Sequence, residues 1–204
     1  MSWGFDLMHD VHVNKLDEHR TRFALNNARA LITDAYSSAE VAINLGFPAE
    51  KIVIFPWGVD LDHFSPQNAK TAGAQWREKM NWQDKHVLLC LRSWEPNYGV
   101  DVLLHAFTQA VRENPDLRLI LLGDGSLHDQ YMEILSSETL QDKIFIGGRV
   151  PNQDLITFFG AADVYVTPSH VDGSSVSLME ALACGLPTIA SDIPANLEWV
   201  QPGK

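Results

Sequence analysis

The sequence HVLLCLR at residues 86–92, with its counterpart LRLILLG at residues 117–123, indicates the fold class of this chain. Within them, VLLCL at residues 87–91 and LILL at residues 119–122 are continuously apolar, which is typical of strands covered on both faces, as in a parallel sheet. Shorter strand patterns follow at residues 143–147, 163–168 and 187–191. Helical patterns alternate with them at residues 99–113, 127–138, 152–160, 175–184 and 194–200. This alternation predicts an α/β protein with a doubly wound parallel sheet.

The first 66 residues read as a separate piece. A polar helical region extends to Arg29, and two strand patterns, at residues 30–33 and 51–55, flank a helix that Gly46 ends. PWGVD at residues 56–60 and the polar, Ala-rich stretch after Pro66 carry little strand signal, so we interpret them as a linker. The predicted domains are therefore residues 1–66, an incomplete first lobe with its linker, and residues 67–204, a second lobe that lacks its terminal element.

Composition excludes several classes of protein. The 204 residues carry a formal net charge of -11 with scattered Lys and Arg, which argues against nucleic acid as a partner. Cys90 and Cys184 lie in apolar segments without CxxC spacing or secretory context, which favours a reducing, cytoplasmic location. No run approaches the ~18 apolar residues of a membrane span, although peripheral contact with a membrane stays open. The spacing of the early histidines matches no metal motif, and no metal is expected.

Polar residues follow four of the predicted strands. They are Arg92, then Gly123 and Asp124, then Arg149, and finally Asp172 with Gly173. In an open parallel sheet, ligands bind beyond the carboxyl ends of the strands, where loops and helix N-termini converge. We therefore expect these four segments to point toward one edge.

Glu180 is the only charged residue of the apolar helix at residues 175–184. A carboxylate in such a position is buried only when something pairs with it, and its two oxygens match the two hydroxyls of a ribose. The alternative is a glutamate at the solvent edge of the helix. At the start of the helix, Ser174 and Ser175 could offer backbone donors and a positive dipole end to a diphosphate. Asp172 could join the site or form only an Asp-Gly turn.

Arg92 is the natural anchor for a phosphate, because its planar guanidinium binds two oxygens and stays charged. The alternative is a surface arginine that caps a strand. Tyr98 lies in the loop that follows and could donate one hydrogen bond to a phosphate. Gly123 and Asp124 allow close approach of a ligand, but a tight turn explains them equally well.

The chain resembles the retaining, sugar-nucleotide-dependent glycosyltransferases of family 4, which have the two-lobed GT-B fold. The motifs that carry the resemblance cover nearly the whole chain and stand in the family's order: PWGVD at residues 56–60 with Phe64, Arg92 with GVD at 99–101, LLGDG at 121–125, IGGRV at 146–150, and EALACGLP at 180–187.

The resemblance implies a role for each matching residue. Glu180 matches the second of two acidic residues and would hold the ribose hydroxyls, while Asp172 matches the first, usually Glu, which contacts the donor sugar. Arg92 matches the arginine that binds phosphate. A lysine that shares the diphosphate charge in the family is replaced here, at Asn97 or Tyr98. The backbone around Arg149 and Val150 would border the base.

The resemblance also implies the reaction. A sugar would pass from a nucleoside diphosphate to an acceptor hydroxyl with retention at the anomeric carbon, and no metal or other cofactor would be required. The acceptor, whether glycan, lipid or small molecule, is not identified. Two alternatives stay open: a non-catalytic nucleotide-binding or scaffold module, and one half of a split enzyme that needs a separate first lobe. Missing strands would also leave open edges and bare apolar surface, so we expect self-association.

Overall fold

The computed structural model describes residues 2, 4, 6–137 and 140–201, which form two compact units. The first unit contains the chain up to Gly58 together with His170–Val176 and the residues from Asp192 onward. The second unit contains Val59–Ser169 and Ser177–Ser191. This division differs from the predicted one because two late segments pack with the first unit. As domain boundaries, residues 1–66 and 67–204 stay a prediction.

The second unit is built on a five-stranded parallel sheet. Its strands lie in the order β5-β4-β3-β6-β7. Their bounds are β3 His86–Cys90, β4 Leu117–Leu122, β5 Ile144–Gly148, β6 Val164–Thr167 and β7 Thr188–Ala190. All five strands were expected from the sequence. Successive strands add outward from β3 on one side and then from β6 on the other, so the order reverses between β3 and β6, as in a doubly wound sheet.

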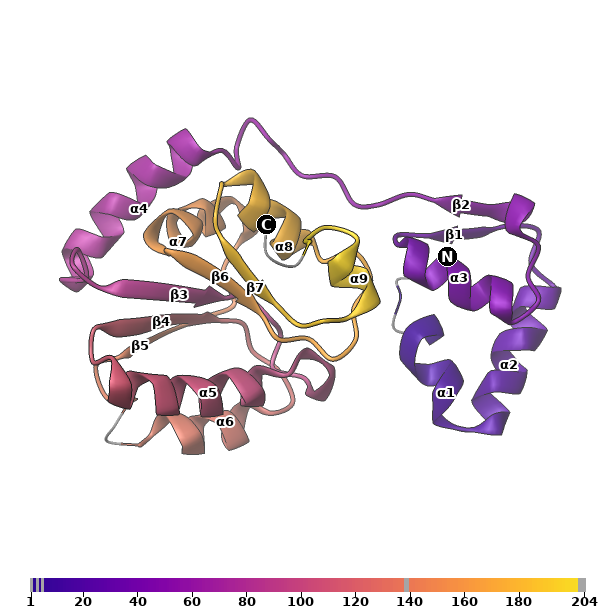
Figure 1. The fold of residues 1–204 in the computed structure, drawn as a ribbon, viewed down its shortest axis with the longest axis horizontal. Helices are drawn as coiled ribbons and strands as arrows, with labels where there is room; N and C mark the ends of the chain where they lie inside the picture. The colour runs from indigo at the N-terminus through magenta and orange to yellow at the C-terminus, as the bar shows by residue number, and fades with distance from the viewer. Residues whose placement is uncertain (1, 3, 5, 138–139, 202–204) are drawn as a thin grey trace. The chain divides into compact units, whose positions relative to one another are not determined.

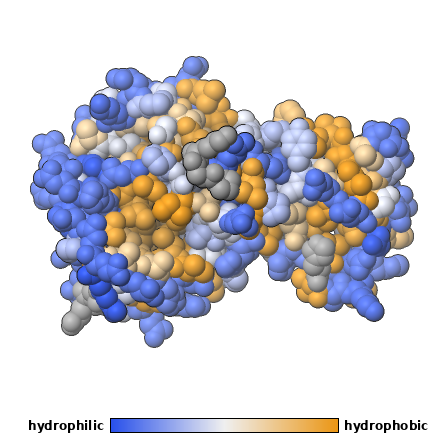
Figure 2. All heavy atoms as spheres, in the orientation of Figure 1, coloured by the Kyte–Doolittle hydropathy of each residue, from blue (hydrophilic) through white to orange (hydrophobic). Residues whose placement is uncertain are grey.

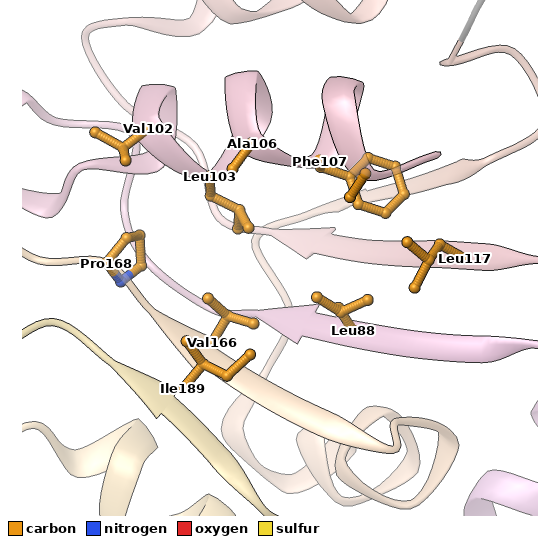
Figure 3. Close-up of a pocket in the computed structure, with 10 residues that line it drawn as sticks. Leu88, Val102, Leu103, Ala106, Phe107, Leu117, Val166, Pro168 and Ile189 are labelled. Carbon is orange, nitrogen blue, oxygen red and sulfur yellow. The ribbon is translucent and has the colours of Figure 1, made fainter. Parts of the chain in front are cut away.

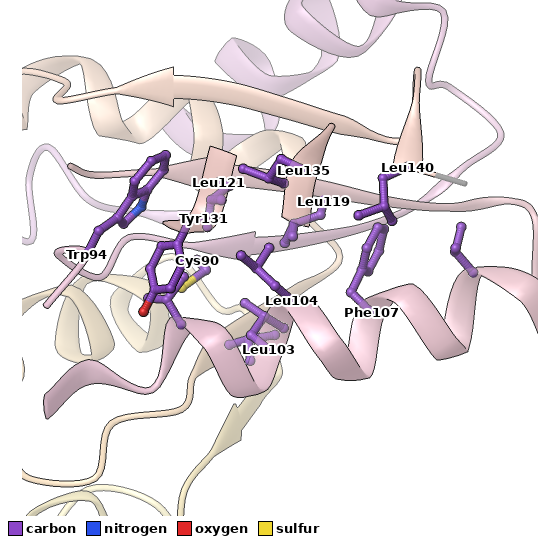
Figure 4. Close-up of a cluster of buried hydrophobic side chains, with 13 residues drawn as sticks. Cys90, Trp94, Leu103, Leu104, Phe107, Leu119, Leu121, Tyr131, Leu135 and Leu140 are labelled. Atoms are coloured by element: carbon purple, nitrogen blue, oxygen red, sulfur yellow. The ribbon is translucent and has the colours of Figure 1, made fainter. Parts of the chain in front are cut away.

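Helices cover both faces of this sheet (Figure 1). Helices α5 (Val100–Glu113) and α6 (His128–Leu135) lie on one face, and α4 (Pro66–Met80) and α7 (Leu155–Ala161) lie on the other. Figure 4 shows the main core cluster between α5, α6 and the sheet, with Trp94, Phe107 and Tyr131 among its largest side chains. The fully apolar central strands therefore have apolar partners on each side, which explains why they lack alternation.

Helix α4 corrects one expectation, because the Ala-rich stretch after Pro66 is not a linker. Pro66 occupies the first helical turn, where its missing N–H costs nothing. The helix then crosses α7 so closely that a Cβ on Gly73 would lie 1.9 Å from the carbonyl carbon of Gly160. Arg77 adds a polar tie by donating to the carbonyl of Ala161 at 2.8 Å and to Asp163 at 2.5 Å. Gly73 lowers the helix propensity of this stretch, and the packing of α4 against α7 stabilises the helix.

The first unit contains a much smaller sheet of two parallel strands, β1 (Leu31–Thr33) and β2 (Ile52–Ile54). A π-helical turn (Asp6–Asp10) is followed by the helices α1 Val11–Val13, α2 Lys15–Asn26, α3 Tyr36–Asn44 and α9 Pro194–Leu197. Gly46, at φ +95°, follows the end of α3 as expected. Glu198 accepts hydrogen bonds from the amides of Tyr36 and Ser37 and so caps α3.

Apolar side chains reach the surface of both units (Figure 2). In the second unit, a groove of about 270 Å³ lies between α5 and the strands β3, β6 and β7, and residues such as Leu88, Val102 and Ile189 line it (Figure 3). In the first unit, Ile32, Val53 and Phe55 are exposed. None of the helices in the described residues is both long and apolar enough to span a membrane.

Candidate functional site

A cavity of about 430 Å³, lined by polar and apolar residues alike, opens at the carboxyl ends of β3, β4 and β5 in the second unit. Three sequence-predicted segments meet there, as the strand-end rule requires. Its lining consists of Leu91, Ser93, Leu122, Gly123, Asp124, Arg149, Val150, Leu155 and Ser177. The structure thus brings Gly123, Asp124, Arg149 and Val150 together at one edge, while their roles stay a prediction.

Gly123 is required by the backbone around it. Its φ is +109°, and a Cβ there would lie 2.4 Å from the carbonyl oxygen of Arg92. The Gly123 amide donates to the carbonyl of Gly148 at 2.7 Å, and the Trp94 amide donates to the carbonyl of Asp124 at 3.2 Å. The conformational freedom of glycine therefore lets the ends of three strands approach one another at the cavity.

Asp124 carries the negative charge of this edge. Its Oδ1 accepts a hydrogen bond from the Gly125 amide at 2.9 Å and lies 3.0 Å from Nδ1 of His128. Hydrogen bonding to His128 and then to Gly125 lowers the pKa of Asp124, with Arg149 contributing a smaller favourable charge. The carboxylate therefore stays ionised beside the Arg149 guanidinium.

Arg92 is buried, with 8% of its surface exposed, so it is not a surface arginine that caps a strand. Its guanidinium carbon lies 4.2 Å from the centroid of the Tyr98 ring. Nη1 of Arg92 is 3.5 Å from the Ser177 hydroxyl, which in turn bonds the Tyr165 hydroxyl at 2.7 Å. Because Ser177 and the chain neighbours Leu91 and Ser93 line the cavity, Arg92 adjoins the cavity without being one of its lining residues.

Glu180, on helix α8 (Val176–Ala183), is only 4% exposed, which excludes the solvent-edge alternative. Asn152 donates its side-chain N–H to Oε1 of Glu180 at 2.8 Å. Burial raises the pKa of Glu180, while the Asn152 hydrogen bond and the charge of His63 oppose that rise. Asn152 lies two residues after Val150, so the carboxylate adjoins the segment that lines the cavity.

The predicted residues Asp172, Gly173, Ser174 and Ser175 belong to the first unit. There the Ser174 amide donates to Oδ2 of Asp34 at 3.1 Å, and the Ser174 hydroxyl donates to the Asp34 carbonyl at 2.6 Å. Asp172 accepts from the Gly173 amide at 3.0 Å, in the manner of an Asp-Gly turn. The amide that we expected to meet a diphosphate thus bonds a carboxylate of its own unit.

Sequence reasoning missed Ser177 and Asn152, the polar partners of the two buried ionic side chains. Ser177 lies three residues before Glu180 and so on the same helical face, which was a usable signal. Nothing in the sequence pairs Asn152 with Glu180, because 28 positions separate them. In the part of the chain that the structure describes, no three His, Cys, Asp or Glu side chains are grouped to hold a metal ion.

The fold and the site define an α/β protein with a ligand cavity at the carboxyl edge of a parallel sheet. The family model of the glycosyl transferases group 1 matches residues 74–204, and the chain belongs to that family. The expected glycosyltransferase is confirmed at this level. The GT-B type of fold is confirmed by the structural comparisons that follow.

Two curated relatives are mannosyltransferases. The GDP-mannose-dependent alpha-(1-6)-phosphatidylinositol monomannoside mannosyltransferase of Mycolicibacterium smegmatis is 28% identical, over 96% of this chain and 53% of its own length. The Corynebacterium glutamicum GDP-mannose-dependent monoacylated alpha-(1-6)-phosphatidylinositol monomannoside mannosyltransferase is 31% identical, over 72% of this chain and 40% of its own. The chain therefore spans about half, or less, of the length of these relatives.

Solved structures share the fold at lower identity. Anabaena Alr3699/HepE, in a complex with UDP-glucose, superimposes with a TM-score of 0.82 over 98% of this chain and 55% of its own, at 20% identity. The C-terminal domain of a group 1 glycosyl transferase (LpcC) from Francisella tularensis gives a TM-score of 0.59 over 71% of this chain and 75% of its own. At these identities the likeness establishes the fold alone.

Proposed function

We propose that this chain is the donor-binding portion of a retaining family 4 glycosyltransferase, which transfers a sugar from a nucleoside diphosphate to an acceptor hydroxyl. The observation that carries the proposal is a buried cation, Arg92, and a buried carboxylate, Glu180, in the unit that holds the strand-end cavity. Buried charges of this kind are costly unless they pair with a partner or a ligand. A nucleoside diphosphate would offer phosphate oxygens to the arginine and ribose hydroxyls to the carboxylate.

The site residues of the second unit would then have the following chemical roles. Arg92 binds the diphosphate and stabilises the negative charge that develops as the sugar departs. Glu180 accepts hydrogen bonds from the ribose hydroxyls, with Asn152 holding one of its oxygens in place. The cavity wall at Gly123, Asp124, Arg149 and Val150 borders the base.

For the first unit, the proposed roles are those that the family resemblance implies. Asp172 contacts the donor sugar in this proposal and, being one methylene shorter than the usual Glu, must approach more closely or meet a different hydroxyl. Gly173, Ser174 and Ser175 form the loop that carries it. Leaving-group stabilisation falls on Arg92 above all, because the Ser174 amide bonds Asp34.

The names of the relatives support a nucleoside diphosphate sugar as the donor, but they do not agree on its base or its sugar. The curated mannosyltransferases use GDP-mannose, whereas the solved neighbour holds UDP-glucose. A nucleoside diphosphate sugar is common to both, and we propose that class without choosing base or sugar. We also propose that no metal or other cofactor takes part, that the protein works in the cytoplasm, where peripheral membrane contact would bring a lipid acceptor within reach, and that a first-lobe partner completes the acceptor side.

Calorimetry with GDP, UDP and their sugars tests the proposal. We expect Glu180→Ala to weaken nucleoside diphosphate binding at least tenfold, since a hydrogen bond to a charged group contributes about 1.5–3 kcal/mol. Glu113→Ala, at an exposed position on α5, is the matched control and should bind like the wild type. Hydrolysis or transfer of the bound sugar would distinguish an enzyme from a non-catalytic module. Absence of nucleotide binding by the wild type would contradict both.

A further inference from the structure

Arg92 is held over the aromatic ring of Tyr98, one of the two residues, with Asn97, that stand where the resemblance implies a second cation. The guanidinium carbon lies 4.2 Å from the Tyr98 centroid, within the ~6 Å range of a cation–π interaction. The guanidinium has little contact with solvent, and desolvation strengthens such an interaction. In the family a lysine shares the binding of the diphosphate charge with the arginine. Without that lysine, diphosphate affinity would depend more strongly on where Arg92 lies.

Tyr98 is itself fixed by the local backbone. It ends the short 3₁₀ turn Pro96–Tyr98, and its amide donates to the Glu95 carbonyl at 3.0 Å. Gly99, the residue that precedes α5, has a φ of +60°, a conformation that glycine adopts without strain. The Tyr98 ring also packs against the main core cluster. The surface on which the guanidinium lies is thus a rigid part of the fold.

A second contact fixes the arginine at its tip. Nη1 lies 3.5 Å from the Ser177 hydroxyl, and the fully buried Tyr165 holds that hydroxyl through its own hydroxyl at 2.7 Å. The Tyr98 ring thus contacts the guanidinium at one place, and Ser177, which lines the cavity, contacts it at another. A cation positioned in advance binds an anion without losing side-chain entropy at that moment.

We propose, on the basis of the proposed function, that Tyr98 is a positioning residue for the diphosphate-binding Arg92 and acts through its ring instead of its hydroxyl. The sequence suggested the opposite, a phenol that donates to phosphate. The two roles separate cleanly, because phenylalanine keeps the ring and removes only the hydroxyl. Leucine keeps an apolar side chain and removes the ring.

The test measures binding of GDP and UDP, with guanosine and uridine as probes that lack phosphate. We expect Tyr98→Phe to bind the diphosphate within twofold of the wild type. We expect Tyr98→Leu to bind it about tenfold more weakly, a loss of ~1.4 kcal/mol. Nucleoside affinity should be equal in all three proteins, since base and ribose do not meet Arg92. A merely structural role for Tyr98 would weaken nucleoside binding as well.

The outcomes keep the inference and the proposed function apart. If the wild type binds neither GDP nor UDP, the proposed function is contradicted, and so is this inference. If the wild type binds the diphosphates but Tyr98→Phe binds them as weakly as Tyr98→Leu, the inference alone is overturned. The hydroxyl of Tyr98 would then be the group that acts. Unchanged binding by Tyr98→Leu also overturns the inference. Should the leucine variant fail to fold, Tyr98→Met removes the ring in its place, and diphosphate binding within twofold of the wild type by that variant would overturn the inference.

Discussion

The two units of this chain bury their sheets to very different degrees. In the second unit, helices cover the five strands on both faces, and Leu89, Leu119 and Ile120 have no exposed surface. In the first unit, the two strands leave Ile32 39% and Val53 53% exposed. These two residues are direct partners in the register of β1 and β2 and share one face. The second unit therefore buries its own sheet on both faces, and its cavity lies at the edge of a well-packed core.

The close crossing of α4 and α7 gives the largest expected effect. A Cβ on Gly160 would lie 1.7 Å from the carbonyl oxygen of Ala69, so Gly160→Ala forces the two backbones apart. We expect a loss of ~3 kcal/mol in the free energy of unfolding of the second unit, measured by urea titration. Gly58→Ala, where nothing lies within 4 Å of the added Cβ, is the control. Equal stability of the two variants would mean that the crossing is not tightly packed.

The buried Asp34 tests how the first unit holds its late segment. Asp34→Ala leaves the Ser174 amide without its acceptor, and we expect a loss of about 2 kcal/mol. Asp34→Asn keeps an acceptor and should lose less. Hydrogen exchange of residues 170–176, together with thermal unfolding, measures both effects. Exchange that is unchanged in Asp34→Ala would show that other contacts hold the segment.

Asp34 also predicts a pH dependence. Burial raises the pKa of Asp34, against the opposing hydrogen bonds from Ser174 and Trp57. The folded state therefore binds the proton more tightly than the unfolded state. The associated stabilisation is complete below the usual carboxyl pKa and is lost as pH rises through the raised one. The difference in stability between wild type and Asp34→Asn should fall over that interval, and a flat difference would contradict the raised pKa.

The exposed sheet face predicts the smallest effect, on association. Phe55, 73% exposed, follows Val53 by two positions and continues its face of the strand. We expect the wild type to self-associate and Phe55→Lys to weaken this by about 1.5 kcal/mol, or roughly tenfold. Leu61→Lys, an equally exposed position in the second unit, should not. Size-exclusion chromatography is the measurement, and a sharp monomeric wild-type profile would contradict the prediction.

The sequence predicted the second unit's sheet because each strand has its own local signal. The continuous apolar runs at β3 and β4 exclude a half-solvated strand, and the residues after them were placed at one edge by topology alone. Helix α4 was missed since Gly73 lowers the local helix propensity, and the small alanines of this stretch give no clear apolar period of 3.6 residues. Only its packing against Gly160 makes those small residues favourable.

The site divides in the same way. The residues chemically suited to a nucleotide sugar could be predicted from the sequence, since the apolar helix around Glu180 and the strand-end position of Arg92 are local facts. Their partners follow only from the folded chain. Tyr98 stacks on Arg92, Asn152 bonds Glu180, and Asp34 takes the Ser174 amide. The reason is physical: burial and strand ends follow from short-range patterns, whereas a hydrogen bond between distant residues depends on how the whole chain folds.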